Sequence, residues 1–387
     1  MSIPYWRLSG FYFFYFATLG VFIPYWNLYL KDIGINAREI GELSALLAGT
    51  RIIAPNLWGW IADRSGQGLK IIRSVSFLAA LIFTGFLSTR DYSWIMALTV
   101  GFSFFWNSAL PQYETVTLFH LQNEPHRYSQ IRLWGSIGFI LAVFSIGAWL
   151  DYYAIGLLPY ALIFFLGSIW VMAVLTPDVV IASHSHPPIR LWQIIKQPEI
   201  LAFLGVYLLL QLSHGPYYIF YSLYLKQNQY SATAIGGLWA LGVCAEVLVF
   251  TYMRKLLQRY SLRQLVLMSI IGAASRWLLI AWGINSIILL SIAQVLHAAS
   301  FGMAHVAAIH LIYNYFGQQH QHKGQALYSS VSFGLGGTLG SLLSGYCWEP
   351  LGAAQVFSVA ALVCVLAFAA AYFGLGLENT QKHGLIR

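Results

Sequence analysis

The chain has 387 residues, of which 58% are hydrophobic and only 9% charged, whereas soluble domains are about a quarter charged. Most of its length cannot be solvated surface, which excludes a soluble globular protein. The formal charge of +8 is explained by basic loops beside a membrane, so it gives no ground for nucleic-acid binding.

Twelve apolar stretches follow one another along the chain. A helix needs about 20 such residues to cross a bilayer, and continuous apolar runs favour helices over the alternating strands of an outer-membrane barrel. The predicted spans are 9–30, 39–61, 71–88, 93–119, 128–150, 154–175, 199–225, 232–253, 262–283, 286–314, 325–346 and 351–376. No small-residue cleavage site follows the first span, so we expect it to be retained as a helix.

The distribution of Lys and Arg predicts the orientation in the membrane. Fourteen fall in the segments on one side, among them Arg190, Lys382 and Arg387. The other side carries only Lys31, Arg38, Arg90 and Lys226. The positive-inside rule then places both termini in the cytoplasm, and we expect a multi-pass protein of a bacterial cytoplasmic membrane.

The longest polar interruption, TPDVVIASHSHPPIRLWQ at 176–193, divides the spans six and six. We predict an N-terminal six-helix bundle at 1–176, a cytoplasmic linker at 177–196 and a C-terminal six-helix bundle at 197–387. A shift of 195 residues aligns NLYLKDIGINAREIGELSALL with SLYLKQNQYSATAIGGLWALG. This match indicates a parallel repeat, in which Arg51 falls on Glu246.

Five charged residues lie well inside the predicted helices: Arg51, Glu114, Arg132, Glu246 and Arg276. Each costs roughly 2.5 to 3.5 kcal/mol at a helix centre, so each should face a cavity or a partner. Three arginines and two glutamates leave one positive charge in excess. An anionic substrate would neutralise it, with chloride, water or a snorkelling Arg51 as alternatives.

Depth in the membrane selects one pair among these charges. Glu114 and Arg132 lie about 6 to 8 Å below the same surface, and Asn107 shares the helical face of Glu114. Glu246 and Arg276 lie at different depths, so we do not expect them to be partners.

Three histidines fall in the tenth span. His297, His305 and His310 are about 80° and 140° apart around a helix, so no single face collects them as metal ligands. We predict no metal and no cofactor. His297 lies near mid-membrane, where it could carry a proton, and a neutral hydrogen-bonded histidine is the alternative.

Aromatic residues make up 16% of the chain. Trp106 and Tyr113 in the fourth span and Tyr217 in the seventh could line a cavity for a ring-bearing solute. Interfacial belts and ordinary packing are the alternative explanations.

The segment GWIADRSGQGLK, residues 59–70, resembles the helix 2 to 3 loop motif of the major facilitator superfamily. Gly59, Asp63 and Arg64 stand in the motif positions, while Gln67 and Gly68 replace its usual basic pair. The resemblance implies an all-α membrane fold of twelve helices in two pseudo-symmetric bundles, with Asp63 and Arg64 bracing a cytoplasmic gate.

Within that superfamily, YSQIRLWGSIG at 128–138 resembles the helix 5 signature of the phenylpropionate permease group and of the related lactose permeases and nucleoside proton symporters. The resemblance implies substrate binding by Glu114 and Arg132 and proton coupling by Arg276 and His297. Ser300 replaces the glutamate expected three residues after that histidine, so Glu246 or Glu114 is the alternative titrating group.

We expect a proton-coupled symporter that works by alternating access, and not an enzyme. The resemblance implies an aromatic carboxylate such as 3-phenylpropionate as the imported solute, and the positive charge in excess inside the membrane is consistent with an anion. The predicted substrate-binding residues are Arg51, Asn107, Tyr113, Glu114, Arg132 and Tyr217. We expect a small-molecule substrate, a proton, the lipid bilayer and a monomer. A sugar or nucleoside symporter is the nearest alternative, and an intramembrane enzyme or a receptor is a remote one.

Overall fold

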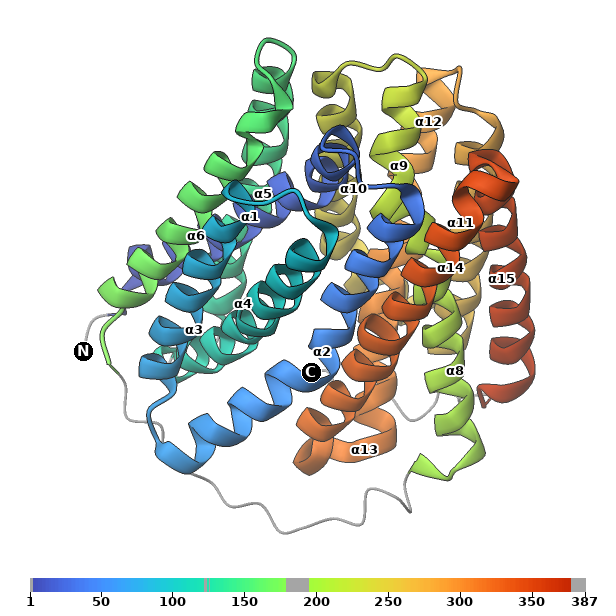
Figure 1. Ribbon diagram of the computed structural model, residues 1–387. Helices are drawn as coiled ribbons and strands as arrows, with labels where there is room; N and C mark the ends of the chain where they lie inside the picture. The colour runs from blue at the N-terminus through green and yellow to red at the C-terminus, as the bar shows by residue number, and fades with distance from the viewer. Residues whose placement is uncertain (1–2, 122–123, 125, 179–194, 377–387) are drawn as a thin grey trace. The chain divides into compact units, whose positions relative to one another are not determined.

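The computed structural model describes residues 3–121, 124, 126–178 and 195–376, and throughout these ranges the chain forms helices joined by short turns (Figure 1). The first six helices are α1 (Tyr5–Asp32), α2 (Ala37–Ser65), α3 (Gly68–Phe83) with the 3-10 turn η1 (Thr84–Leu87), α4 (Tyr92–His120), α5 (Arg127–Leu150), and α6 (Leu158–Leu175) preceded by the 3-10 turn η2 (Ile155–Leu157). Each predicted span of this half coincides with a helix.

The second half contains interrupted helices. Its elements are α8 (Pro198–Ser213), α9 (Gly215–Gln227), α10 (Ala232–Arg259), α11 (Leu262–Trp282), α12 (Ile287–Val295), the π-helical turn η3 (Ala298–Met303), α13 (Ala304–Ser329), the π-helical turn η4 (Ser330–Gly336), α14 (Gly337–Leu351) and α15 (Ala353–Gly374). The predicted span 199–225 is broken at His214, beside Pro216, and Gly317 interrupts α13 with a φ of +67°. By length and composition, nine helical segments in the described ranges could cross a membrane.

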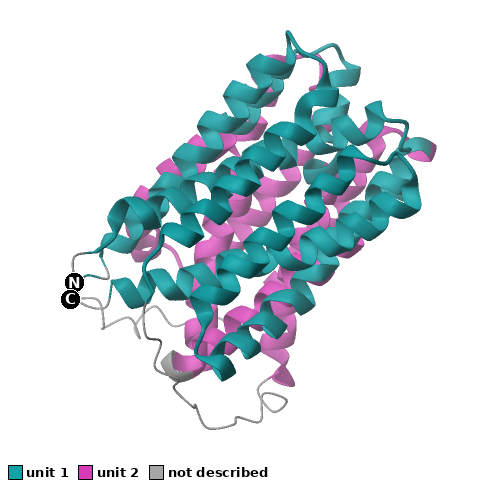
Figure 2. Ribbon diagram, turned by 60° about the vertical axis from the view of Figure 1, so that its left-hand side comes forward, with its two compact units in different colours: residues 1–187, 217–240, 341–349 teal, residues 188–216, 241–340, 350–387 magenta. Residues whose placement is uncertain are grey.

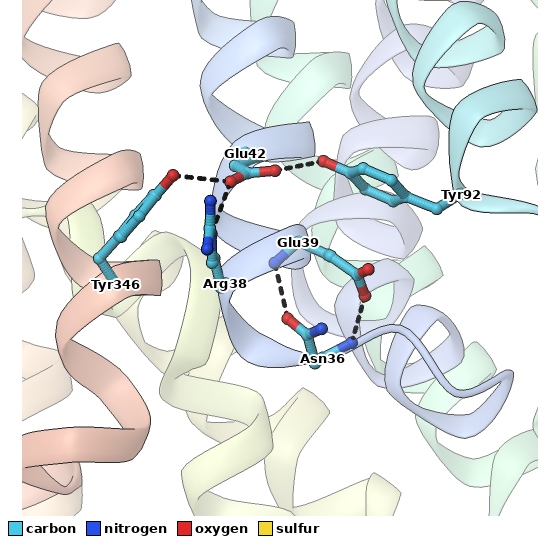
Figure 3. A network of polar contacts seen from close by, with 6 residues as sticks. All are labelled: Asn36, Arg38, Glu39, Glu42, Tyr92 and Tyr346. Carbon is cyan, nitrogen blue, oxygen red and sulfur yellow. Dashed lines mark hydrogen bonds and ion pairs between the residues drawn. The ribbon is translucent and has the colours of Figure 1, made fainter.

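Local sequence signals account for several helix ends. At the start of α2, Asn36 accepts a hydrogen bond from the amide of Glu39, whose side chain accepts one from the amide of Asn36 (Figure 3). This capping box satisfies amides that a helix leaves without partners. Ser261 and Gln264 form the same box at α11, and Gly66 ends α2 with a φ of +66°.

Backbone contacts divide the chain into two compact units (Figure 2). Unit 1 comprises residues 1–187, 217–240 and 341–349, and unit 2 comprises residues 188–216, 241–340 and 350–387. The predicted bundles differ in assigning 217–240 and 341–349 to the second half, so the division at 177–196 stays a prediction. Of the predicted linker, 179–194 lies outside the described residues, as do Arg190, Lys382 and Arg387.

Unit 1 is built around α1, which packs on α5 and α6, while α4 packs on α2 and α3. Two glycines, Gly41 and Gly236, bring helices into backbone contact in this unit. A Cβ atom on Gly41 would lie 2.6 Å from the Cα of Gly345, and one on Gly236 would lie 2.6 Å from the carbonyl oxygen of Val143. Gly41 and Gly236 are equivalent in the 195-residue repeat, so both halves of the sequence use the same position for close packing.

Polar contacts accompany these close approaches. Near Gly41, the Glu42 carboxylate accepts hydrogen bonds from the hydroxyl groups of Tyr92 and Tyr346 and pairs with Arg38 at 3.0 Å (Figure 3). These contacts join α2, α4 and the 341–349 segment of α14 through one carboxylate.

Near Gly236, Asp151 caps the first turn of α10. Its carboxylate accepts hydrogen bonds from the amide of Ala232 at 2.6 Å, and from the amide at 3.0 Å and the hydroxyl at 2.6 Å of Thr233. Burial alone would raise the pKa of Asp151, but these bonds hold it below its usual value. The end of α5 is thereby tied to the start of α10.

In unit 2, α15 packs on α8 and α11, and α8 packs on η4. The hydroxyl of Tyr207 donates to the carbonyl of Ala304 at 2.8 Å, and Trp277 donates from its indole nitrogen to Ser213 at 3.2 Å. The turn η4, whose Ser332 donates to the carbonyl of Tyr207, and the start of α13 just after η3 are therefore held against α8.

Candidate functional site

Arg51, on α2, is half-buried and close to few polar groups. Its Nε donates to the Oδ1 of Asn107 on α4 at 3.4 Å. Within the described ranges, no carboxylate oxygen lies within 4.0 Å of its guanidinium. The phenol groups of Tyr15 and Tyr218 are close enough to interact with it electrostatically. An interior arginine in such surroundings can bind an anion through its two terminal nitrogens.

The interior of unit 1 near Arg51 is rich in aromatic rings. Trp106 lies one residue before Asn107, and its ring centroid is 5.7 Å from that of Tyr15 and 5.4 Å from that of Phe22. Its indole nitrogen is buried and has no hydrogen-bond partner among the residues that the structure describes. Trp106 and Tyr15 are buried, so these rings form an aromatic layer beside Asn107 with that unpaired N–H donor inside it.

A second aromatic group comes from α9 and α10, in segment 217–240 of the same unit. Trp239 lies against Tyr217 with 4.5 Å between ring centroids, and Tyr218 lies 6.4 Å from it. Its indole nitrogen donates to the hydroxyl of Ser222 at 3.0 Å. Tyr217, predicted to contact substrate, thus belongs to a packed cluster, and Tyr218 is the member that approaches Arg51.

Tyr113, another predicted substrate contact, is fully buried. Its ring stacks on Phe11 with 3.5 Å between centroids, and its hydroxyl is 2.8 Å from the hydroxyl of Thr176. The ring and the hydroxyl therefore both have partners within the protein.

The structure does not bring Glu114 and Arg132 into an ion pair. The guanidinium of Arg132 lies over the ring of Phe16, with 3.9 Å from Cζ to the centroid, and 5.8 Å from the ring of Tyr12. Glu114 accepts a hydrogen bond from the hydroxyl of Tyr128 at 3.3 Å. Equal depth does not determine which way two side chains point, which is why the expected direct pair is absent from the described contacts.

Unit 2 holds a second group of charged and polar side chains. The Nε2 of His297 lies 3.7 Å from the carboxylate of Glu246. Arg276 is fully buried and donates from Nη2 to the Oε1 of Gln294 at 3.3 Å, with its Cζ 4.8 Å from the ring centroid of Trp277. The three residues predicted for proton coupling therefore lie in one unit, and Glu246 and His297 are close enough to exchange a proton through a small movement.

The π-helical turn η3 changes the arrangement of the histidines. The ring of Phe301 is parallel to that of His297, at 5.3 Å and 8°, and to that of His305, at 6.3 Å and 6°. The predicted separation of about 80° assumed an uninterrupted α-helix, whereas a π turn takes more residues per turn and brings these positions into line. No group of three or more His, Cys, Asp or Glu in the described chain is placed to hold a metal ion.

A small, partly open pocket of about 10 Å³, room for roughly one water molecule, lies in unit 2 between α8, η3 and η4. Polar groups of Gln211, His214, Ser300, His305 and Tyr328 are among its lining. Sequence reasoning did not single out Gln211 and His214, although both are polar residues in an otherwise apolar run.

Comparison with known proteins settles the family. The sequence family described as MFS_1 like matches residues 5–359. The chain belongs to this major facilitator family.

The relatives of this major facilitator protein are transporters. The Escherichia coli K12 "Probable 3-phenylpropionic acid transporter" is 30% identical over 369 residues, covering 93% of this chain and 95% of the relative. The Geobacillus stearothermophilus "Maltose permease" is 26% identical, covering 92% and 91%. The chain is thus a multi-pass membrane transporter of a small molecule and not an enzyme.

Solved structures agree on the fold. The crystal structure of the nucleoside transporter NupG matches with a TM-score of 0.86 at 16% identity, over 98% of this chain and 100% of that one. This likeness confirms the predicted all-α, twelve-helix architecture of the major facilitator family.

The motif that resembles the family's helix 2 to 3 loop lies at the end of α2. Asp63 and Arg64 are exposed, and the guanidinium of Arg64 lies 5.4 Å from the ring centroid of Trp60. Gly59 faces the side chain of Gln112: a Cβ atom added to Gly59 would lie 3.2 Å from the Nε2 of Gln112. The bracing role of Asp63 and Arg64 in the gate stays a prediction.

Sequence reasoning missed three polar groups that contact predicted site residues. Gln294 accepts a hydrogen bond from Arg276, Tyr128 donates one to Glu114, and Thr50 accepts one from Asn107. Gln294 could have been found as the polar residue one helical turn before His297, since such neighbours share a face. Nothing in the sequence indicates which face of α5 directs Tyr128 toward α4.

Proposed function

We propose that this transporter imports an aromatic carboxylate of the size of 3-phenylpropionate together with a proton, and that Arg51 binds the carboxylate. The observation that carries the proposal is that the positive charge of Arg51 has no nearby carboxylate in the described chain. Its guanidinium has no carboxylate within 4.0 Å in the described chain, and only its Nε is engaged in a hydrogen bond. Insertion of an unneutralised cation is costly, and a substrate anion offsets that cost.

The aromatic surroundings support a substrate that carries a ring. Trp106 and Tyr15 lie beside the Arg51 and Asn107 pair, and Tyr218 approaches from α9. Rings of this kind bind a phenyl group through apolar contact and edge-to-face or offset packing. A carboxylate at Arg51 and a phenyl ring among these residues match the two ends of 3-phenylpropionate, which the Escherichia coli relative is named for.

Proton coupling is assigned in this proposal to the Glu246 and His297 pair. A carboxylate and an imidazole 3.7 Å apart can share or pass a proton, and buried Arg276 disfavours additional positive charge nearby. Glu114 and Arg132 are further candidates for substrate contact, because Arg132 has an aromatic neighbour and no carboxylate partner in the described ranges.

Uptake into proteoliposomes tests the proposal. An inward proton gradient should drive accumulation of 3-phenylpropionate, and a protonophore should abolish it. Arg51→Gln should lose this uptake. Arg51→Lys should keep part of it, because lysine retains the positive charge but lacks the planar guanidinium with its paired N–H donors. Arg90→Gln makes the same change at an exposed position and should transport normally. Wild-type rates in Arg51→Gln, or uptake unaffected by the protonophore, would refute the proposal.

The second candidate function is transport of a neutral sugar or nucleoside. The maltose permease relative favours it, as do the hydrogen-bonding groups of Glu114 and Tyr128, which could bind hydroxyl groups. A panel containing 3-phenylpropionate, maltose and a nucleoside separates the candidates. Under the second, a neutral solute accumulates and Arg51→Gln leaves its uptake intact.

A further inference from the structure

Asn107 is fixed in one orientation by groups on both sides of its amide. Its Nδ2 donates to the carbonyl oxygen of Leu47 at 3.0 Å and to the hydroxyl of Thr50 at 2.8 Å, while its Oδ1 accepts from the Nε of Arg51 at 3.4 Å. A backbone carbonyl cannot donate and a guanidinium cannot accept. The amide can therefore satisfy both neighbours in only one of its two flipped states.

The hydroxyl that holds Asn107 is itself held. The Oγ1 of Thr50 lies 2.9 Å from the carbonyl oxygen of Leu47 and 3.0 Å from the Oγ of Ser103. Ser103 is fully buried and donates to the carbonyl of Val100 at 3.3 Å. Ser103, Thr50 and Asn107 thus form a chain of hydrogen bonds that crosses between α4 and α2 and ends on Arg51.

This chain determines which edge of the guanidinium is engaged. Arg51 has five N–H donors in a plane, and Asn107 occupies the one at Nε. In the described part of the chain the terminal nitrogens Nη1 and Nη2 have no hydrogen-bond partner. These two nitrogens form the edge that binds both oxygens of a carboxylate at once.

We infer that Ser103, Thr50 and Asn107 orient Arg51 so that its Nη1 and Nη2 edge is presented to the substrate carboxylate, an inference that rests on the proposed function. Asn107, predicted from sequence to contact substrate, is then a positioning residue, as are Thr50 and Ser103. Selectivity for a carboxylate over a neutral group of the same shape depends on this orientation as well as on the charge.

The residue types allow a sharp test. Asn107→Ala removes the acceptor at Nε and lets the guanidinium rotate. Thr50→Val replaces the hydroxyl with a methyl group of similar volume and weakens the hold on Asn107, whereas Thr50→Ser keeps the hydroxyl and serves as the matched control.

The experiment is calorimetric binding of 3-phenylpropionate and of its neutral isostere 3-phenylpropionamide to the purified full-length protein. Asn107→Ala should weaken binding of the acid about tenfold and leave that of the amide nearly unchanged, since the lost bond engages a charged group. Thr50→Val should also lower the ratio of acid affinity to amide affinity, but by less than Asn107→Ala does. Thr50→Ser should have the same ratio as wild type.

The outcomes separate this inference from the function on which it rests. A wild-type protein that binds the acid no better than the amide refutes the proposed function, and the inference with it. If wild type prefers the acid but Asn107→Ala and Thr50→Val keep its affinity ratio, the inference alone is overturned. An equal loss for both ligands also overturns it, because a purely structural role would weaken both.

Discussion

The cap that Asp151 forms on α10 gives a prediction whose size follows from the structure. In Asp151→Ala, three hydrogen bonds are lost, two of them from amides that the first turn of a helix leaves without partners. Loss of an N-cap acceptor costs about 1 kcal/mol, and loss of the charge at the helix terminus about 0.5 kcal/mol more. The expected total of roughly 1.5 kcal/mol corresponds to about a tenfold change in an opening equilibrium.

Hydrogen exchange at the start of α10 measures this effect. Protection factors of the Ala232 and Thr233 amides should fall about tenfold in Asp151→Ala, from the opening equilibrium above. Thr233→Val should have a smaller effect because it leaves both amide bonds in place. The exposed Asp32 provides the control Asp32→Ala. Wild-type protection in Asp151→Ala would show that the cap contributes nothing to the first turn.

The pH dependence of this contact has a definite sign. Because the pKa of Asp151 is lowered in the folded protein, the cap stabilises the first turn above the usual Asp pKa of about 3.9. That contribution is lost only as the pH falls through the lowered pKa. Protection factors, corrected for intrinsic exchange, should therefore be constant from about pH 5 to 8. A decrease in protection across that range would contradict the assignment.

Three further predictions concern packing, a polar contact and coupling. Gly236→Val should lower the melting temperature in detergent, because the new side chain meets backbone atoms at an overpacking cost of about 1 to 3 kcal/mol. Gly237→Ala should leave it unchanged, since no atom lies within 4 Å of the added Cβ. Equal melting temperatures for the two variants would contradict the packing. Tyr92→Phe, which removes a hydrogen bond to a carboxylate, should destabilise by about 1 to 2 kcal/mol in the same assay, and an unchanged melting temperature would count against that bond. Glu246→Gln should abolish gradient-driven accumulation yet retain exchange of substrate across the membrane, as should His297→Gln; loss of exchange as well would mean that the pair serves binding.

Hydropathy predicted the fold because the membrane imposes it. A bilayer requires each spanning segment to satisfy its own backbone, so length and apolarity nearly suffice to find a helix. The interruptions were less accessible. The break at His214 precedes Gly215 and Pro216, which favour a helix break but do not lower hydropathy enough to divide the span. Hydropathy carries no signal for the π turn at 298–303.

The candidate site was predicted in part. Arg51 was recognisable as a charge in an apolar run, while the equal depth of Glu114 and Arg132 stays a prediction. Side-chain direction was beyond that reasoning, since Arg132 lies on Phe16 and Glu114 bonds Tyr128. Position along a helix is read from sequence, whereas rotation of one helix against another is decided by contacts between segments far apart in the chain.

The central claim is that Arg51 binds the carboxylate of the substrate. Its most direct measurement is the affinity of purified Arg51→Gln and wild-type protein for 3-phenylpropionate and for 3-phenylpropionamide. Wild type should prefer the acid, and Arg51→Gln should lose roughly 100-fold in affinity for the acid, about 3 kcal/mol, while binding the amide as wild type does. Unchanged affinity for the acid in Arg51→Gln would contradict the claim.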